Sequence, residues 1–164
     1  MSLESFTADQ IEVSVKGTFK TEHYFAANYQ SLGKLLLNAA RSEGIFHGAD
    51  ESQLMIRKNG FWKAVYEIHQ DGRLIGKATP RGAFKRAFDI DYEDMPIALT
   101  PGGSRLRSWS VRDSKGGVLC EFLPRKSLKR GAQIRIGAEL PLPLIILCYI
   151  LVIRRWQEES SSAA

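Results

Sequence analysis

Two clusters of basic side chains are the residues of this sequence best suited to bind a ligand. The first cluster comprises Arg125, Lys126, Lys129 and Arg130, and the second comprises Arg81, Lys85 and Arg86. A basic residue held near an anionic lipid surface contributes about 1 kcal/mol of attraction. A solvated loop that only keeps a protein soluble can have the same composition. A phosphate site would require the fold to bring the two clusters together.

Other residues that could support chemistry do not form a recognisable site. His23, His47 and His69 have no Cys, Asp or Glu at ligand spacing. The acidic run 89–94 (DIDYED) lacks the glycine and spacing of an EF-hand loop, so we expect a solvated turn. The sequence contains no GxSxG, no P-loop and no GxGxxG after a strand. We therefore predict a non-enzymatic protein with no metal site and no cofactor.

Trp109 lies among Arg105, Arg107 and Arg112, and aromatic residues between basic ones can stack on nucleic-acid bases. A core tryptophan with charged neighbours would show the same pattern. Nucleic acid is therefore the less favoured partner, and an anionic phospholipid surface is the favoured one.

The charge of the chain is unevenly distributed along the sequence. Residues 1–100 hold 12 Lys/Arg and 13 Asp/Glu, whereas residues 101–156 hold 11 Lys/Arg and 3 Asp/Glu. An asymmetry of this kind indicates an anionic partner, either a membrane surface or nucleic acid.

The two cysteines and the N-terminal ten residues indicate the cellular compartment in which the protein is expected. Cys120 and Cys148 are the only cysteines and have no metal-binding spacing, so both are expected to be buried and reduced. The opening MSLESFTADQ has no apolar signal segment. We expect a cytoplasmic protein that associates peripherally with a membrane.

Many short strands are predicted from alternation and turn signals. Ile11–Val15 alternates apolar and polar side chains, and similar stretches recur up to residue 138. Asn59-Gly60 and Gln70-Asp71-Gly72 are typical turns between strands. This pattern predicts an antiparallel barrel or sandwich. Two stretches stay open: 18–30, where the aromatics would suit strands, and 32–40, which fits a short helix or a strand with a bulge at Gly33.

The stretch Leu140–Trp156 (LPLPLIILCYILVIRRW) predicts a helix that is apolar on every face. Its uncharged part covers 14 residues, Leu140–Ile153, whereas a bilayer core requires about 20 apolar residues. Arg154 and Arg155 fit a last helical turn. A buried core helix is favoured over a C-terminal membrane anchor, because the inner faces of the strands also need a covering partner.

The order of several motifs resembles the tubby C-terminal-like superfamily, which includes tubby proteins, phospholipid scramblases and LURP-one-related proteins. The motifs are Tyr66-Glu-Ile followed by Asp71-Gly-Arg-Leu-Ile-Gly76, then Phe88-Asp-Ile90, Trp109-Ser-Val-Arg-Asp113 and Leu140-Pro-Leu-Pro143. The resemblance covers 61–156 well and 11–58 loosely. It implies a mainly β fold: a closed antiparallel β-barrel of about a dozen short strands around a central hydrophobic C-terminal α-helix.

The resemblance also implies association with phospholipid, including phosphoinositide binding as in tubby proteins. Scramblase-like members carry an acidic calcium-binding segment before the helix, but here residues 124–138 contain no acid. The chain therefore departs from the family pattern to which calcium dependence belongs, and the resemblance leaves calcium dependence open. The predicted organisation is a flexible N-terminus (1–10), a barrel domain (11–157) with its core helix at about 142–156, and a disordered tail (158–164). A soluble scaffold protein without a lipid role is the alternative function.

Overall fold

The protein is described here from a computed structural model, which covers residues 5–6, 9–40, 42–60, 64–82, 87–102, 107–125 and 130–162. Within these residues, twelve strands form a closed barrel. They are β2 (Gln10–Lys16), β3 (Thr21–Ala27), β4 (Gln30–Leu37), β5 (Glu43–Gly48), β6 (Gln53–Asn59), β7 (Val65–Gln70), β8 (Arg73–Pro80), β9 (Phe88–Tyr92), β10 (Met95–Pro101), β11 (Trp109–Arg112), β12 (Val118–Pro124) and β13 (Gly131–Ile136).

Each strand of the barrel pairs antiparallel with its neighbours in sequence, and β13 pairs with β2 to close the ring. At this seam Ile134 lies opposite Ile11, and Gly131 lies opposite Ser14. Closure leaves no free edge among the described strands of the barrel, because each of β2 to β13 has a partner on both sides. The predicted closed antiparallel barrel is therefore confirmed.

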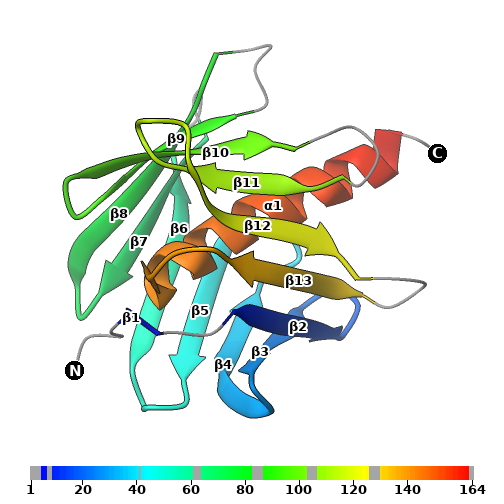
Figure 1. Ribbon diagram of the computed structural model, residues 1–164. Coiled ribbons are helices and arrows are strands. Elements are labelled where there is room, and N and C mark those ends of the chain that lie inside the picture. Colours follow the sequence, from blue (N-terminus) through cyan, green and yellow to red (C-terminus); the bar gives the residue numbers. More distant parts are fainter. Residues whose placement is uncertain are drawn as a thin grey trace.

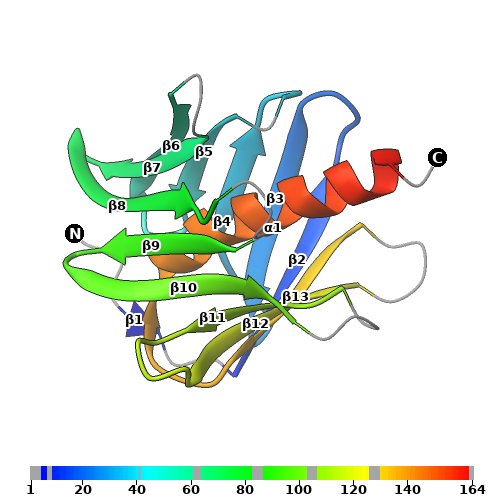
Figure 2. The ribbon, with the colours of Figure 1, turned by 90° about the horizontal axis from the view of Figure 1, so that it is seen from above.

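The helix α1 (Leu142–Ser162) runs through the middle of the barrel (Figure 1). The view from above shows strands on all sides of it (Figure 2). Every residue from Leu142 to Ile153 is buried, and these side chains pack against the inward-facing residues of the strands. Fully burying one large aliphatic side chain contributes about 1.5–3 kcal/mol, so the helix is the centre of the core.

The helix is longer than the sequence indicated. It extends to Ser162, whereas the predicted core helix ends at about 156 and a disordered tail was expected from 158. Arg154 and Arg155 consequently lie inside the helix and not in its last turn. Among the described residues, no helix combines the length and the apolar character needed to span a bilayer.

The two stretches left open by the sequence are both strands. Residues 21–27 form β3, with Thr21, His23 and Phe25 facing inward. Residues 30–37 form β4, and the register against β3 shifts next to Gly33, so the bulge alternative is the one observed. The aromatics Phe19 and Tyr29, expected to suit strands, instead lie in the turns on either side of β3.

A short pair of strands lies outside the barrel, where the chain enters the helix. β1 (Ser5–Phe6) pairs antiparallel with β14 (Leu140–Pro141). Figure 1 places this pair at the end where α1 begins. The N-terminal segment, expected to be flexible, therefore contributes a strand next to the start of the helix.

Candidate anion-binding end of the barrel

The connections between strands alternate between the two ends of the barrel, because each strand runs opposite to the one before it. The end where α1 finishes is reached by the connections 17–20, 38–42, 60–64, 81–87, 102–108 and 125–130, and we call it the basic end. In the amino-acid sequence these connections contain twelve Lys or Arg and no Asp or Glu. Five of the twelve are described by the structure: Lys20, Arg81, Arg107, Arg125 and Arg130.

The opposite end has the reverse charge. It is reached by the connections 28–29, 49–52, 71–72, 93–94, 113–117 and 137–139, and we call it the acidic end. These connections hold seven acids (Asp50, Glu51, Asp71, Glu93, Asp94, Asp113 and Glu139) and one base, Lys115. The fold thus separates charge along the barrel axis, and such a field orients a protein at a charged surface.

Three of the predicted basic residues, Arg81, Arg125 and Arg130, are described and lie at this end, but Arg81 is not brought together with the other two. Arg125 and Arg130 flank the β12–β13 connection and line one pocket. Arg81 lies between β8 and β9, is not among the residues of that pocket, and pairs with Asp89 at 2.7 Å. Lys126, Lys129, Lys85 and Arg86 fall outside the described residues.

The pocket has a volume of about 420 Å³ and opens between the last turns of α1 and the ends of β2, β12 and β13. Val15, Ile153 and Trp156 supply an apolar wall, and Arg107, Arg125 and Arg130 supply positive charge. An apolar wall beside arginines suits a ligand that carries an anionic group on an apolar body. We call this the arginine pocket.

Backbone carbonyl groups orient the arginines of the pocket. Arg130 Nη1 donates to the Gly17 carbonyl oxygen at 2.5 Å, and Arg125 Nη1 donates to the Arg130 carbonyl oxygen at 3.4 Å. Because these carbonyl acceptors are neutral, the hydrogen bonds orient the guanidinium groups of Arg125 and Arg130 without neutralising their positive charge. Among the described residues, no carboxylate lies within ion-pair distance of Arg130, whereas Glu12 forms a long ion pair with Arg125, at 3.9 Å. The positive charge of Arg130 therefore remains available to an anionic ligand.

Arg107 also lines the arginine pocket, although the lipid-binding residues predicted from the sequence did not include it. Its Nη2 donates to the Trp156 carbonyl oxygen at 3.2 Å, its Nε donates to Glu159 at 3.4 Å, and the indole nitrogen of Trp156 donates to the Arg107 carbonyl oxygen at 2.7 Å. Arg107 lies only two residues before Trp109 in the sequence, but β11 begins at Trp109 and does not include Arg107. Arg107 has a φ of 53°, so it belongs to the connection and reaches the helix.

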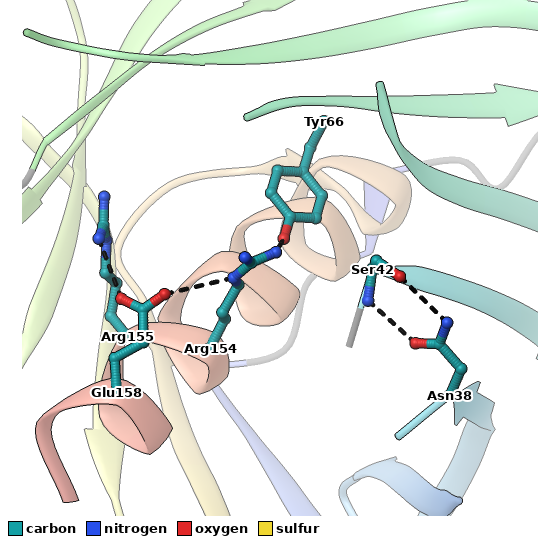
Figure 3. Close-up of polar contacts among 6 residues, drawn as sticks. All are labelled: Asn38, Ser42, Tyr66, Arg154, Arg155 and Glu158. Atoms are coloured by element: carbon teal, nitrogen blue, oxygen red, sulfur yellow. Dashed lines mark hydrogen bonds and ion pairs between the residues drawn. The ribbon is translucent and has the colours of Figure 1, made fainter. Parts of the chain in front are cut away.

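Polar contacts anchor the end of the helix to the barrel wall (Figure 3). Arg154 donates to the Tyr66 hydroxyl and lies 5.6 Å from the ring centroid, and Arg155 lies over the Phe88 ring at 5.0 Å. Glu158 accepts from both arginines, at 3.3 and 3.0 Å. Burial raises the pKa of Tyr66 although the Arg154 guanidinium opposes the shift. The hydroxyl therefore stays protonated and its oxygen accepts from Arg154.

Figure 3 also shows how a neighbouring connection is fixed. The Ser42 amide donates to Asn38 Oδ1 at 2.9 Å, and Asn38 Nδ2 donates to Ser42 Oγ at 3.1 Å. This pair spans the β4–β5 connection at the basic end, so its two ends are held at a fixed separation.

The inner side of the arginine pocket reaches a buried polar group. His23 is buried, its Nε2 is 2.8 Å from the Thr21 hydroxyl, and its Nδ1 is 2.5 Å from the Tyr149 hydroxyl. The rings of His23 and Tyr149 also meet edge to face, at 5.4 Å between centroids. These contacts tie β3 to the middle of α1, which points to a structural role.

The remaining candidates from the sequence have structural explanations. Trp109 is 2% exposed, so it belongs to the core and is not available for stacking on bases. Asp89 and Asp91 lie on the outer side of β9, and Glu93 and Asp94 form the following turn. In the described part of the chain, no cluster of His, Cys, Asp or Glu is suited to a metal ion.

Comparison of the chain with protein-family models, with curated proteins and with solved structures gives no significant match. Membership of the tubby C-terminal-like superfamily therefore stays a prediction that rests on the sequence motifs. The closed barrel and its central helix are observed in the structure.

Proposed function

We propose that this protein is a non-enzymatic module that binds anionic phospholipid, including phosphoinositide, at a membrane surface through the basic end of its barrel. The separation of charge between the two ends of the barrel carries this proposal. A basic cluster on one loop can be a solvated loop, but here six connections that contain twelve basic residues and no acid all leave strands at the same end of the barrel, so their attraction for an anionic surface adds up. Tubby-like and scramblase-like proteins, which the motifs resemble, act on the same class of ligand.

The arginine pocket supports the same ligand class. Arg125 and Arg130 are held in place by carbonyl groups. Glu12 forms a long ion pair with Arg125, at 3.9 Å, and no described carboxylate pairs with Arg130. Guanidinium groups bind phosphate oxygens through paired N–H donors, whereas an isolated lysine acts as a point charge. The basic end therefore combines long-range attraction with local groups that can contact a phosphate.

The proposal is tested by co-sedimentation of the protein with phosphatidylcholine vesicles, with and without phosphatidylserine or phosphatidylinositol bisphosphate. We expect binding only to the anionic vesicles and weaker binding as salt is added. Changing Arg125, Lys126, Lys129 and Arg130 to Ser should weaken binding by about two to three orders of magnitude, at about 1 kcal/mol per residue.

A matched control uses basic residues at the other end of the barrel. Arg73 and Lys115 lie at the acidic end, and changing both to Ser should leave vesicle binding nearly unchanged. Because the control removes two charges and the first variant removes four, a free-energy loss half as large in the control would show that only net charge matters. Equal binding to neutral and anionic vesicles would contradict the proposal and favour the scaffold alternative, and stronger binding to a single-stranded oligonucleotide would favour nucleic acid.

A further inference from the structure

The β2–β3 turn at the basic end exposes a large aromatic side chain. Phe19 is 83% exposed, and Lys16 and Lys20 lie on either side of it in the chain. Phe19 contributes little to the core, because most of its surface remains in water. An exposed aromatic between two lysines is a combination suited to the boundary of an anionic bilayer, where the ring leaves water and the lysines meet headgroups.

The turn that carries Phe19 is held in one shape. Gly17 has a φ of 94°, and a Cβ at this position would overlap the carbonyl oxygen of Lys20, so only glycine fits. The Gly17 carbonyl oxygen also accepts from Arg130, at 2.5 Å. The Phe19 turn is therefore tied to the arginine pocket, and both belong to the basic end of the barrel.

An apolar groove lies beside this turn. It has a volume of about 580 Å³, and its lining includes three aliphatic residues (Leu36, Leu37 and Ile45), two lysines (Lys16 and Lys20) and two acids (Glu22 and Glu43). The carboxylate of Glu22, which also borders the groove, accepts from the Tyr24 hydroxyl at 2.5 Å. The apolar contact surface at this end therefore extends beyond the single side chain of Phe19.

The acidic end offers a direct contrast. Tyr29 is fully exposed at the β3–β4 turn, so each end of β3 presents one aromatic side chain to solvent. Tyr29 follows Asn28 and precedes Gln30, and no lysine or arginine flanks it. Exposure alone therefore does not distinguish Phe19 from Tyr29. The flanking lysines and the adjoining apolar groove distinguish Phe19.

We propose that the barrel docks end-on against an anionic bilayer, with Phe19 and the adjoining groove entering the boundary between the lipid headgroups and the acyl chains. This inference rests on the proposed function and specifies how the membrane is engaged. A soluble phosphate compound would use the lysines and arginines but would gain nothing from Phe19. A nucleic acid that stacked a base on Phe19 would leave the aliphatic groove beside it unfilled. The combination of charge and apolar surface therefore selects a bilayer as the partner.

Site-specific fluorescence tests the orientation. The native thiols Cys120 and Cys148 are buried, so a polarity-sensitive thiol probe will label a Phe19→Cys or a Tyr29→Cys variant selectively. With phosphatidylcholine–phosphatidylserine vesicles, we expect a blue shift at position 19 and quenching by lipids brominated on their acyl chains. Position 29 should show neither change. Equal responses at the two positions, or no response at position 19 of a protein that has bound, would overturn the inference.

Affinity provides an independent measure. The Phe19→Ser variant should bind anionic vesicles roughly tenfold or more weakly, because one aromatic side chain no longer leaves water, and Tyr29→Ser should bind as the unmodified protein does. The loss should persist at high salt, since it is not electrostatic. Unchanged affinity of Phe19→Ser would reject end-on insertion and leave the proposed function intact, whereas a lack of vesicle binding by the unmodified protein would reject both.

Discussion

At the scale of single residues, the two cysteine thiols show how strongly the barrel interior excludes water. Burial raises the pKa of Cys120 to about 12 and raises the pKa of Cys148 well above its ordinary value. Burial, followed by the Glu93 carboxylate, also raises the pKa of Tyr92 to about 12. These groups stay protonated in the native protein at pH values where they ionise in the unfolded chain.

Stability should therefore decrease at alkaline pH. The thiol contribution is fully present below roughly pH 8.5, where unfolded thiols begin to ionise, and it is lost as the pH rises toward 12. Each thiol should lower the free energy of unfolding by up to about 1.4 kcal/mol per pH unit in this range. Urea unfolding at about pH 7.5 and about pH 10 measures the slope.

The control is the double variant Cys120→Ala with Cys148→Ala. It should be less stable at neutral pH, because it contains cavities, but its stability should depend less on pH between the same two conditions. Parallel pH dependence in the two proteins would show that the thiols are not responsible.

At the scale of elements, the seam between β13 and β2 decides whether the barrel closes. Gly131 begins β13 with a φ of 122°, and a Cβ there would overlap the Val13 carbonyl oxygen on β2. The same residue follows Arg130, which reaches across the seam to Gly17. Closure and the position of a candidate lipid-binding arginine therefore depend on the same few residues.

Replacing Gly131 by Ala should lower the free energy of unfolding by about 3 kcal/mol or more, since a backbone strain of about 1–3 kcal/mol adds to the overlap with Val13. Gly72→Ala is the matched control, because Gly72 has a φ of 77° but no atom lies near its would-be Cβ. That control should cost only about 1–2 kcal/mol. Chemical denaturation followed by circular dichroism measures both, and equal losses would mean that the seam has no special role.

At the scale of the whole molecule, the strands and the helix depend on each other for burial. α1 places apolar side chains on every face, and the inward-facing residues of the barrel form one hydrophobic core with them. Ile146 lies at the centre of this arrangement and is fully buried. A change there tests the fold as a unit.

The Ile146→Asp variant should lose the native fold, because an unpaired buried charge costs several kcal/mol and a typical domain has only about 5–15 kcal/mol of stability. Met55→Asp is the control, because Met55 is 39% exposed on β6 and should change stability by less than about 0.5 kcal/mol. Thermal unfolding and the dispersion of amide proton signals compare the two. A folded Ile146→Asp protein of unchanged stability would show that the helix is not the core.

The sequence by itself determined the features that are local. Alternation in Ile11–Val15, the glycine turns and the uncharged run Leu140–Ile153 predict strands, connections and a core helix, because side-chain period and turn geometry are properties of short segments. The stretches 18–30 and 32–40 stayed open for the same reason. Their periods are ambiguous locally, and pairing with neighbouring strands resolved them.

Tertiary structure alone decided the distribution of charge and the composition of the site. Along the sequence the excess of basic residues follows residue 100, but in the folded protein it lies at one end of the barrel, from Lys20 to Arg130. The end that a connection reaches depends on how many strands precede it, so the complete strand order is needed. Contacts between Arg130 and Gly17, or Arg107 and Trp156, join residues far apart in sequence and exist only once the barrel closes around its helix.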